Sequence, residues 1–185
     1  ARNVAVVGGG PAGLAAATTL AERGHRVSLF DAAEHIGGQF NYARRIPGKE
    51  DFAETLRYFR TRLRELNVTQ QLGRTVQAGD LAGYDHVVLA TGIIPRRPPI
   101  PGLDQPKVVS YIDVIEGRRP VGRKVALIGA GGIGFDVAEL ITHEGTSGEL
   151  GSAFASSRGS LLLSVAARRA AGNSSCAAAS ARPDP

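Results

Sequence analysis

The stretch VAVVGGGPAGLAAATTL, Val4 to Leu20, passes from a short apolar run through three consecutive glycines into a segment rich in Ala and Leu. The apolar run over residues 3–9 is short enough for a buried parallel strand. Residues 11–23 predict a helix that stops at Gly24. A second apolar run, over residues 25–31, predicts another strand. Strand, helix and strand within about 30 residues match the size of a βαβ unit, so the stretch predicts a parallel α/β fold.

The turn between the first strand and the helix has the spacing Gly8-x-Gly10-x-x-Gly13. In such a turn the first glycine permits a tight bend, the second lets a pyrophosphate approach the backbone, and the third lets helix and strand pack closely. The helix N-terminus adds unpaired N–H groups and a partial positive charge. Asp31, at the end of the second strand, is suited to accept hydrogen bonds from ribose hydroxyls. The pattern therefore predicts a dinucleotide site.

The same pattern occurs again in VALIGAGGIGFDVAEL, Val125 to Leu140, with Gly129, Gly131 and Gly134 in the turn. Its position after the first unit indicates a nicotinamide nucleotide. A residue that reads the adenosine ribose is expected about 20 residues further on. That point lies near residues 149–152, where the sequence has no strand pattern.

Between the two glycine motifs, the apolar pattern predicts one amphipathic helix and several short strands. The helix starts at an Asp-x-x-Glu capping pattern, Asp51 and Glu54. Its arginines fall between the apolar positions, which favours a solvated outer face over a nucleic-acid patch. In chain order, the predicted segments are a loop over 34–49, the helix over 51–66, short strands over 68–72 and 75–76, a buried strand over 85–90 and a proline-rich connector over 95–106.

The composition excludes several classes of protein. The 185 residues are 43% hydrophobic, which is enough for a core. No apolar run approaches the roughly 20 residues of a membrane span, and no secretory signal is recognised, so we expect a cytoplasmic protein without membrane or nucleic-acid partners. Cys176 is the only cysteine, which excludes an intrachain disulfide and an iron–sulfur cluster held by this chain alone. The four histidines are scattered, so no metal site is predicted.

The character of the chain changes after about Gly145. The remaining residues are rich in Ala and Ser, and their apolar cluster is Leu161 to Leu163. The apolar residues follow neither a helical nor a strand period clearly, apart from a weak helical pattern over 160–171. Such a tail is typical of a disordered extension or of an aberrant C-terminus, such as a shifted reading frame, and we favour the second interpretation.

Two local features indicate FAD at the first glycine motif. The tetrapeptide GPAG at 10–13 looks like the FAD-binding class of this turn. The tripeptide ATG at 90–92 ends the predicted strand over 85–90, as it does near the cofactor in flavoproteins that bind two dinucleotides.

Several longer segments are more specific. They are IGGQFN at 36–41, IPGKE at 46–50, ETLRY at 54–58, TGI at 91–93, PR at 95–96, PPI at 98–100, SY at 110–111, VG at 121–122 and GAGGIGFD at 129–136. Together they closely resemble the bacterial NADPH-dependent 2,4-dienoyl-CoA reductase family. The resemblance covers roughly residues 3–145 and none of the tail.

That family has an N-terminal α/β barrel with FMN and the substrate site, then a four-cysteine iron–sulfur site, then an FAD and an NADPH domain. The resemblance implies that this chain is the start of the FAD and NADPH part. It would pass electrons from NADPH through FAD towards a 2,4-dienoyl-CoA in unsaturated fatty-acid β-oxidation. The FMN, the iron–sulfur cluster and the substrate would be held elsewhere, by a barrel that this chain lacks.

The expected architecture is α/β. A Rossmann-like FAD-binding domain over 1–122 would be followed by the start of an NAD(P)H-binding domain over 123–145, truncated, and an atypical low-complexity tail over 146–185. The resemblance also implies FAD contacts at Ala12, Asp31, Gln39, Lys49 and Val76, with the backbone of Val76 against adenine. No side-chain acid or base need be catalytic. The predicted cofactor-binding residues are Gly8, Gly10, Pro11, Ala12, Gly13, Asp31, Gly38, Gln39, Lys49, Val76, Ala90, Thr91, Gly92, Gly129, Gly131 and Gly134.

Two alternatives stay open. One is another flavoprotein with two dinucleotides, of the trimethylamine dehydrogenase or glutamate synthase small-subunit type. The other is an inactive truncated chain that binds a nucleotide weakly or fails to fold, because a sheet without its later strands leaves apolar faces and edges uncovered.

Overall fold

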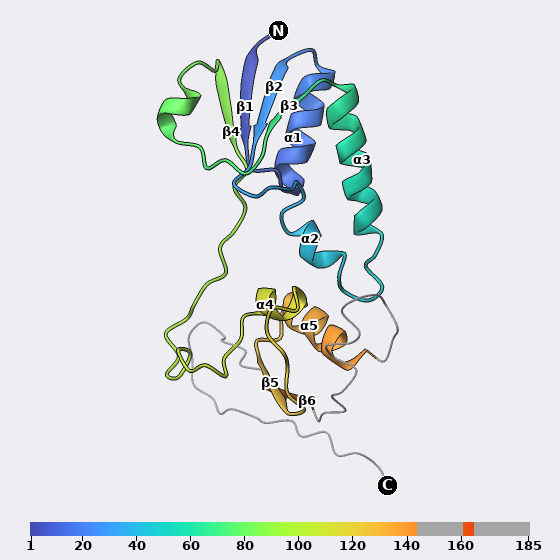
Figure 1. Cartoon of the computed structure of the whole chain (residues 1–185), viewed down its shortest axis with the longest axis vertical. Coiled ribbons are helices and arrows are strands. Elements are labelled where there is room, and N and C mark those ends of the chain that lie inside the picture. Colours follow the sequence, from blue (N-terminus) through green and yellow to red (C-terminus); the bar gives the residue numbers. More distant parts are fainter. Residues whose placement is uncertain (144–160, 165–185) are drawn as a thin grey trace, which may run out of the picture. The chain divides into compact units, whose positions relative to one another are not determined.

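The computed structural model describes residues 1–143 and the strand at 161–164. The chain divides into two compact units, Ala1–Pro99 and Ile100–Pro185 (Figure 1). The division falls inside the predicted proline-rich connector over 95–106, which carries neither helix nor strand. The assignment of residues 1–122 to FAD and 123–145 to NAD(P)H stays a prediction.

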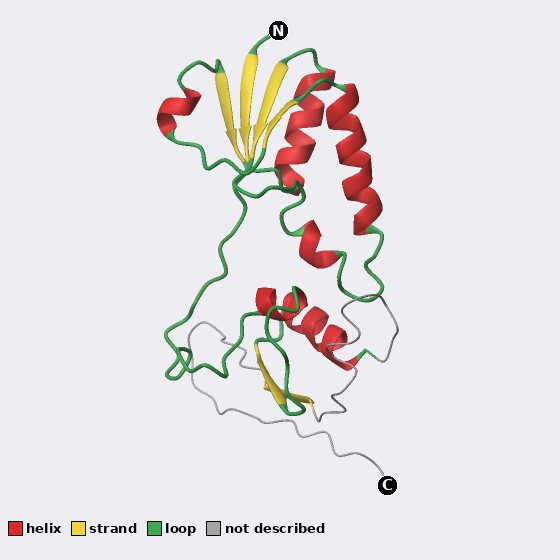
Figure 2. Cartoon of the chain, in the orientation of Figure 1, coloured by secondary structure: helices red, strands yellow, loops and turns green. Residues whose placement is uncertain are grey.

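The first unit is built on a four-stranded sheet in which all pairs are parallel (Figure 2). Its strands lie in the order β3-β2-β1-β4. Their bounds are β1 Asn3–Val7, β2 Arg26–Phe30, β3 Thr69–Gln71 and β4 His86–Leu89. The predicted parallel α/β fold is therefore confirmed, with all four carboxyl ends at one edge of the sheet.

Helices α1, Pro11–Glu22, and α3, Phe52–Glu65, lie side by side on one face of this sheet (Figure 1). Each follows the spacing that puts apolar side chains on one face of a helix. On α3, Leu56 and Leu63 lie two turns apart and are fully buried. They share a core with Leu14 of α1 and with sheet residues.

Three local predictions about this unit are wrong. The loop over 34–49 contains a short helix, α2, Phe40–Ala43. Asp51 does not cap α3 with its side chain, because its backbone is already helical, whereas a capping residue is extended. The strand over 75–76 is absent. There the chain leaves the sheet after β3 for the 3-10 helix η1, Ala78–Leu81, and has no adjacent strand to pair with.

Strand β4 is also less buried than predicted. It lies at the edge of the sheet, and the register pairs Val87 with Ala5 of β1. Val88 packs against the core under the helices, so Val87 and Leu89 face the opposite side. Their exposed fractions are 41% and 73%, because no other described segment covers them.

The described part of the second unit contains two short helices and one pair of parallel strands. Strand β5, Val125–Ile128, leads into helix α5, Gly132–Thr142, and β6, Leu161–Ser164, pairs with β5 over its whole length. Helix α4, Tyr111–Ile115, precedes them. The weak helical prediction over 160–171 is wrong at 161–164, since these residues form a strand, and its other residues lie outside the described part.

Among the described residues, no helix combines the length and the apolar character needed to cross a membrane.

Candidate dinucleotide-binding sites

The turn after β1 has a geometry that only glycine permits. Gly8 has a φ of +111°, and a Cβ at this position would lie 2.2 Å from the carbonyl oxygen of Ala90. A Cβ on Gly13 would lie 1.7 Å from the carbonyl oxygen of Gly8. Both obstacles are backbone atoms that no rotamer change can move away. The start of α1 is thus packed directly onto the end of β1, as the glycine spacing predicts.

This packing presents the first turn of α1 at the carboxyl edge of the sheet. Gly10 is the N-cap in an extended conformation, and Pro11 occupies the first helical position, where its missing N–H costs nothing. The amide groups of Ala12 and Gly13 belong to the set that a helix leaves without intrahelical acceptors. They carry the partial positive charge of the helix end, so the turn fits a pyrophosphate.

Asp31 joins the end of β2 to this turn. Its Oδ2 accepts a hydrogen bond from the amide of Gly9 at 2.5 Å, and its Oδ1 accepts one from the amide of Ala33 at 2.7 Å. The residue is half-buried. Each carboxylate oxygen keeps a second lone pair, so the side chain is held in position while it can still accept hydrogen bonds from ribose hydroxyls.

The segment around Gly38 lies against the same turn. The amide of Gly37 donates to the carbonyl oxygen of Gly9 at 2.7 Å. A Cβ on Gly38, whose φ is +48°, would lie 3.0 Å from the Cα of Gly10. Gln39 follows as the N-cap residue of α2 and is half-buried. The structure therefore places Gly38 against the first glycine motif, with Gln39 next in the sequence, and the contacts of both residues with FAD stay predictions.

Two residues of this site were not predicted. Gly9 supplies the amide that holds Asp31, and Gly37 has a φ of +125° and supplies the bond to Gly9. The paired glycines in GGG at 8–10 and GG at 37–38 are the sequence signal that could have identified them.

The tripeptide at 90–92 reaches the site through strand pairing. The amide of Ala90 donates to the carbonyl oxygen of Val7 at 2.8 Å, because β4 is the neighbour of β1. The Ala90 backbone then packs under Gly8. Thr91 and Gly92 follow as exposed residues of the loop beyond β4.

Val76 and Lys49 lie in two other segments. Val76 is half-buried in the loop after β3, and Lys49 is half-buried in the turn before α3. The loop around Val76 is held by Asp80, which accepts hydrogen bonds from the amide of Gln77 at 2.9 Å and from Arg74 at 2.5 Å. The Gln77 hydrogen bond and then the Arg74 charge hold the pKa of the Asp80 carboxyl below its ordinary value. The contacts of Val76 and Lys49 with FAD stay predictions.

The second glycine turn repeats the backbone of the first. Gly129 has a φ of +119°, and Gly131 is an extended N-cap of α5, as Gly10 is of α1. A Cβ on Gly134 would lie 2.6 Å from the carbonyl oxygen of Gly129. One difference concerns Gly129. Among the described residues nothing lies within 4 Å of a Cβ built on it, whereas Ala90 packs on Gly8.

A model of the pyridine nucleotide-disulphide oxidoreductase family matches residues 2–150. The chain belongs to this family. It is therefore a domain of the FAD-dependent pyridine-nucleotide oxidoreductases, whose cofactors are FAD and NAD(P)H.

Several known members of this oxidoreductase family are similar to the chain. Bilirubin reductase of Mediterraneibacter gnavus is 36% identical over 146 residues, which cover 78% of this chain and 23% of that protein. The N,N-dimethylglycine/sarcosine dehydrogenase of Chromohalobacter salexigens is 40% identical over 134 residues, which cover 68% of this chain and 19% of that protein. The structure of a 2-naphthoyl-CoA reductase in complex with 2-naphthoyl-CoA superimposes with a TM-score of 0.72 at 34% identity, covering 76% and 22%.

The chain spans about a fifth of the length of each of these relatives. Their names describe different substrates, so the similarity supports the oxidoreductase family without selecting one reaction. The resemblance to 2,4-dienoyl-CoA reductase is a proposal within that family.

Proposed function

We propose that the chain binds FAD at the first glycine turn and NADPH at the second, and that it serves a reductase of 2,4-dienoyl-CoA. The observation that carries this proposal is the repetition of one turn geometry. Gly8 and Gly129 have φ values of +111° and +119°, and each turn joins a parallel strand to the N-terminus of a helix. Two dinucleotide turns in one chain suit a hydride donor and its flavin acceptor.

In this proposal the amides of Ala12 and Gly13 hold the FAD pyrophosphate. Asp31, whose carboxylate is already oriented by two backbone amides, accepts the ribose hydroxyls. Gln39 and Lys49 line the segment that would cover the cofactor, and Val76 would contact adenine through its backbone. Gly38 and the residues at 90–92 complete the rim of the turn.

The flavin supplies the redox chemistry when it is bound, because it can accept a hydride and pass on single electrons. The residues of this chain bind and orient the two cofactors. None of them needs to act as a catalytic acid or base.

The choice of NADPH over NADH follows from the resemblance to the NADPH-dependent 2,4-dienoyl-CoA reductases, which extends through the second glycine turn at 129–136.

The substrate class is supported by two observations. The segments IGGQFN at 36–41 and IPGKE at 46–50 resemble the 2,4-dienoyl-CoA reductases. The similar 2-naphthoyl-CoA reductase is also named for an unsaturated CoA thioester. The substrate site itself would lie in a part of the enzyme outside this chain.

A second candidate is a nucleotide-binding chain without turnover of its own. It is favoured by the exposed Val87 and Leu89 on the first sheet, whose uncovered apolar face would hinder a stable isolated domain.

The test is an anaerobic absorbance titration of the purified chain with FAD, followed by NADPH. The proposal expects a bound-flavin spectrum that bleaches when NADPH is added, and bleaches less readily with NADH. A bound flavin that stays oxidised would contradict the role of the second turn. A chain that binds no FAD would leave only the second candidate.

The substrate class is tested on the longer enzyme of which this chain would be a part, because the substrate site would lie outside the chain. NADPH-dependent reduction of a 2,4-dienoyl-CoA by that enzyme would support the reductase. Reduction of its flavin by N,N-dimethylglycine would instead support an amine dehydrogenase, to which the 40% identical relative points.

A further inference from the structure

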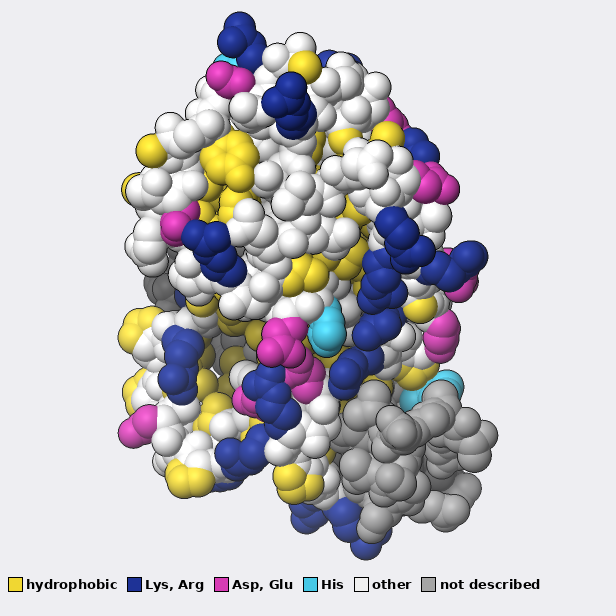
Figure 3. All heavy atoms as spheres, turned by 45° about the horizontal axis from the view of Figure 1, so that its top comes forward, with side chains coloured by type: hydrophobic (Ala, Val, Ile, Leu, Met, Phe, Trp, Pro, Cys, Tyr) yellow, Lys and Arg dark blue, Asp and Glu magenta, His cyan; other side chains and the backbone are white. Residues whose placement is uncertain are grey.

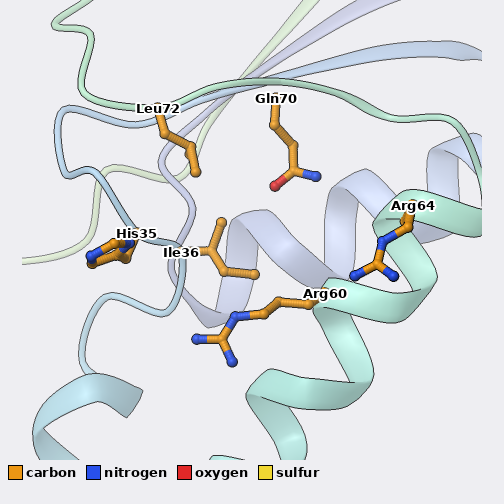
Figure 4. Close-up of a pocket in the computed structure, with 6 residues that line it drawn as sticks. All are labelled: His35, Ile36, Arg60, Arg64, Gln70 and Leu72. Carbon is orange, nitrogen blue, oxygen red and sulfur yellow. The ribbon is translucent and has the colours of Figure 1, made fainter.

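A pocket of about 270 Å³ lies in the first unit, between α3, the segment after β2, and β3. None of the predicted cofactor-binding residues lines it. Figure 4 shows Gln70 and Leu72 directed from the β3 side towards α3, with the Ile36 side chain between Leu72 and Arg60. The lining residues are His35, Ile36, Arg60, Arg64, Gln70 and Leu72.

The two arginines of this pocket form a like-charged pair. Arg60 and Arg64 are four residues apart on α3, so their side chains lie one helical turn apart on the same face and repel each other. In the described part of the chain, neither guanidinium has an acidic partner within ion-pair distance. An anion between them would remove the repulsion.

The other arginines of α3 are paired. Arg57 donates to Glu54, with 2.7 Å between Nε and Oε2. Arg62 donates to Glu22 at 2.5 Å and to Glu65 at 2.8 Å. The helix therefore neutralises the arginines that face away from the pocket and leaves the two at the pocket uncompensated. Figure 3 shows Lys and Arg side chains gathered in a run on the side where Figure 1 draws α3.

The remaining lining residues are suited to an organic group. Ile36 is only 3% exposed and forms an apolar base, and Leu72 is half-buried beside it. The Gln70 amide and the His35 imidazole can each donate a hydrogen bond. Two guanidinium groups next to an apolar surface match a doubly charged phosphate that carries a small apolar or planar substituent.

We propose that the pocket between α3 and β3 binds a small organic phosphate monoester. Arg60 and Arg64 hold the phosphate group, and Ile36 and Leu72 contact the organic group. The pocket adjoins the FAD turn, because Ile36 lies 3.5 Å from a Cβ built on Gly9, but none of the proposed cofactor-binding residues lines it.

The test is calorimetric titration of the full chain with phenyl phosphate, and in parallel with inorganic phosphate. We expect phenyl phosphate to bind more tightly than inorganic phosphate, since only the former reaches the apolar base. Arg60→Gln and Arg64→Gln should each weaken phenyl phosphate binding by about tenfold, because each removes charge-assisted hydrogen bonds. Arg60→Lys keeps the charge and the helix. Its affinity for phenyl phosphate should lie between those of the unmodified chain and Arg60→Gln, because lysine cannot bind a phosphate bidentately.

The matched control is Arg57→Gln, which removes the same charge from the same helix outside the pocket. It should change the affinity less than twofold. An equal loss in all three glutamine variants would mean general charge attraction and would overturn the proposal, as would the absence of binding to the unmodified chain. Competition by FAD, tested with the chain saturated in FAD, would make the pocket part of the cofactor site and would also overturn it.

Discussion

Single backbone positions decide whether the first turn can form. Gly13 is the most restrictive of them, because a Cβ there would lie 1.7 Å from a backbone oxygen of Gly8. Asp31 has the opposite role, since its side chain joins two segments through the amides of Gly9 and Ala33. At both positions, the residue that stabilises the turn is also the one proposed to contact FAD: Gly13 the pyrophosphate and Asp31 the ribose.

We predict that Gly13→Ala separates α1 from β1. The forced contact should cost about 1–3 kcal/mol of unfolding free energy, and FAD affinity should fall by at least about tenfold, as expected when a charge-assisted hydrogen bond is lost. Urea unfolding and FAD titration measure the two effects. The control is Gly83→Ala, where a Cβ meets nothing within 4 Å. Equal behaviour of the two variants would show that the turn tolerates a side chain.

We predict that Asp31→Asn weakens FAD binding by about tenfold, because the amide replaces one of two charged acceptor oxygens by a donor. Fluorescence titration of the flavin measures the affinity. Asp51→Asn is the control, since the Asp51 side chain makes no cap hydrogen bond and lies outside the predicted site. Unchanged affinity in Asp31→Asn would exclude a ribose contact by this carboxylate.

At the scale of elements, the two glycine turns have the same backbone geometry but differ in the segments that pack against them. Strand β4 places Ala90 under Gly8, whereas the described part of the second unit has nothing within 4 Å of a Cβ on Gly129. The first turn is thus held from three sides, by α1, by Asp31 and by β4. We expect the first turn to bind its cofactor with less rearrangement than the second.

We predict that the stability of the loop that carries Val76 decreases at acid pH, because Asp80 of η1 holds this loop. The folded-state pKa of Asp80 is lowered, mainly by the Gln77 amide and then by Arg74. Its contribution is therefore present above the ordinary aspartate pKa of about 3.9 and is lost as the pH falls through the lower folded-state value. Asp80→Asn should reduce stability at pH 7 and differ less from the unmodified chain at pH 3. Urea unfolding at both pH values measures this, and a difference that is independent of pH would contradict it.

At the scale of the whole molecule, each unit exposes apolar side chains that a typical domain would cover. In the first unit these include Val87 and Leu89, and in the second Ile128 and Phe135, which are 62% and 59% exposed. Uncovered apolar surface promotes association between copies of a chain.

We predict that Leu89→Lys raises the soluble fraction of the purified chain and changes the unfolding free energy by no more than about 0.5 kcal/mol, as for other exposed positions. The contrasting variant is Val88→Lys, which should destabilise the chain because Val88 packs against the core. Light scattering and urea unfolding distinguish the two. If Leu89→Lys destabilises the chain as much as Val88→Lys, the face of β4 is not free.

Local patterns predicted the parts of this protein in which a residue interacts with its own neighbours in sequence. The two glycine turns, the helix after each and the strand before each follow from spacing, because only glycine can adopt these φ values or accept the contact between Gly13 and Gly8. The tripeptide at 90–92 predicted a strand that ends near the cofactor, whereas the pairing of β4 with β1 was not predicted.

Tertiary structure decided what depends on distant partners. The residues at 75–76 are not a strand because no strand lies beside them, and those at 161–164 are one because β5 does. Val87 and Leu89 have a buried-strand pattern, yet the absence of a covering described segment leaves them exposed. The sequence pattern likewise did not distinguish Arg60 and Arg64, at the pocket, from the ion-paired arginines of the same helix. Spacing along the chain determines which conformations a segment can adopt, but burial and charge pairing are set by whichever segment packs against it.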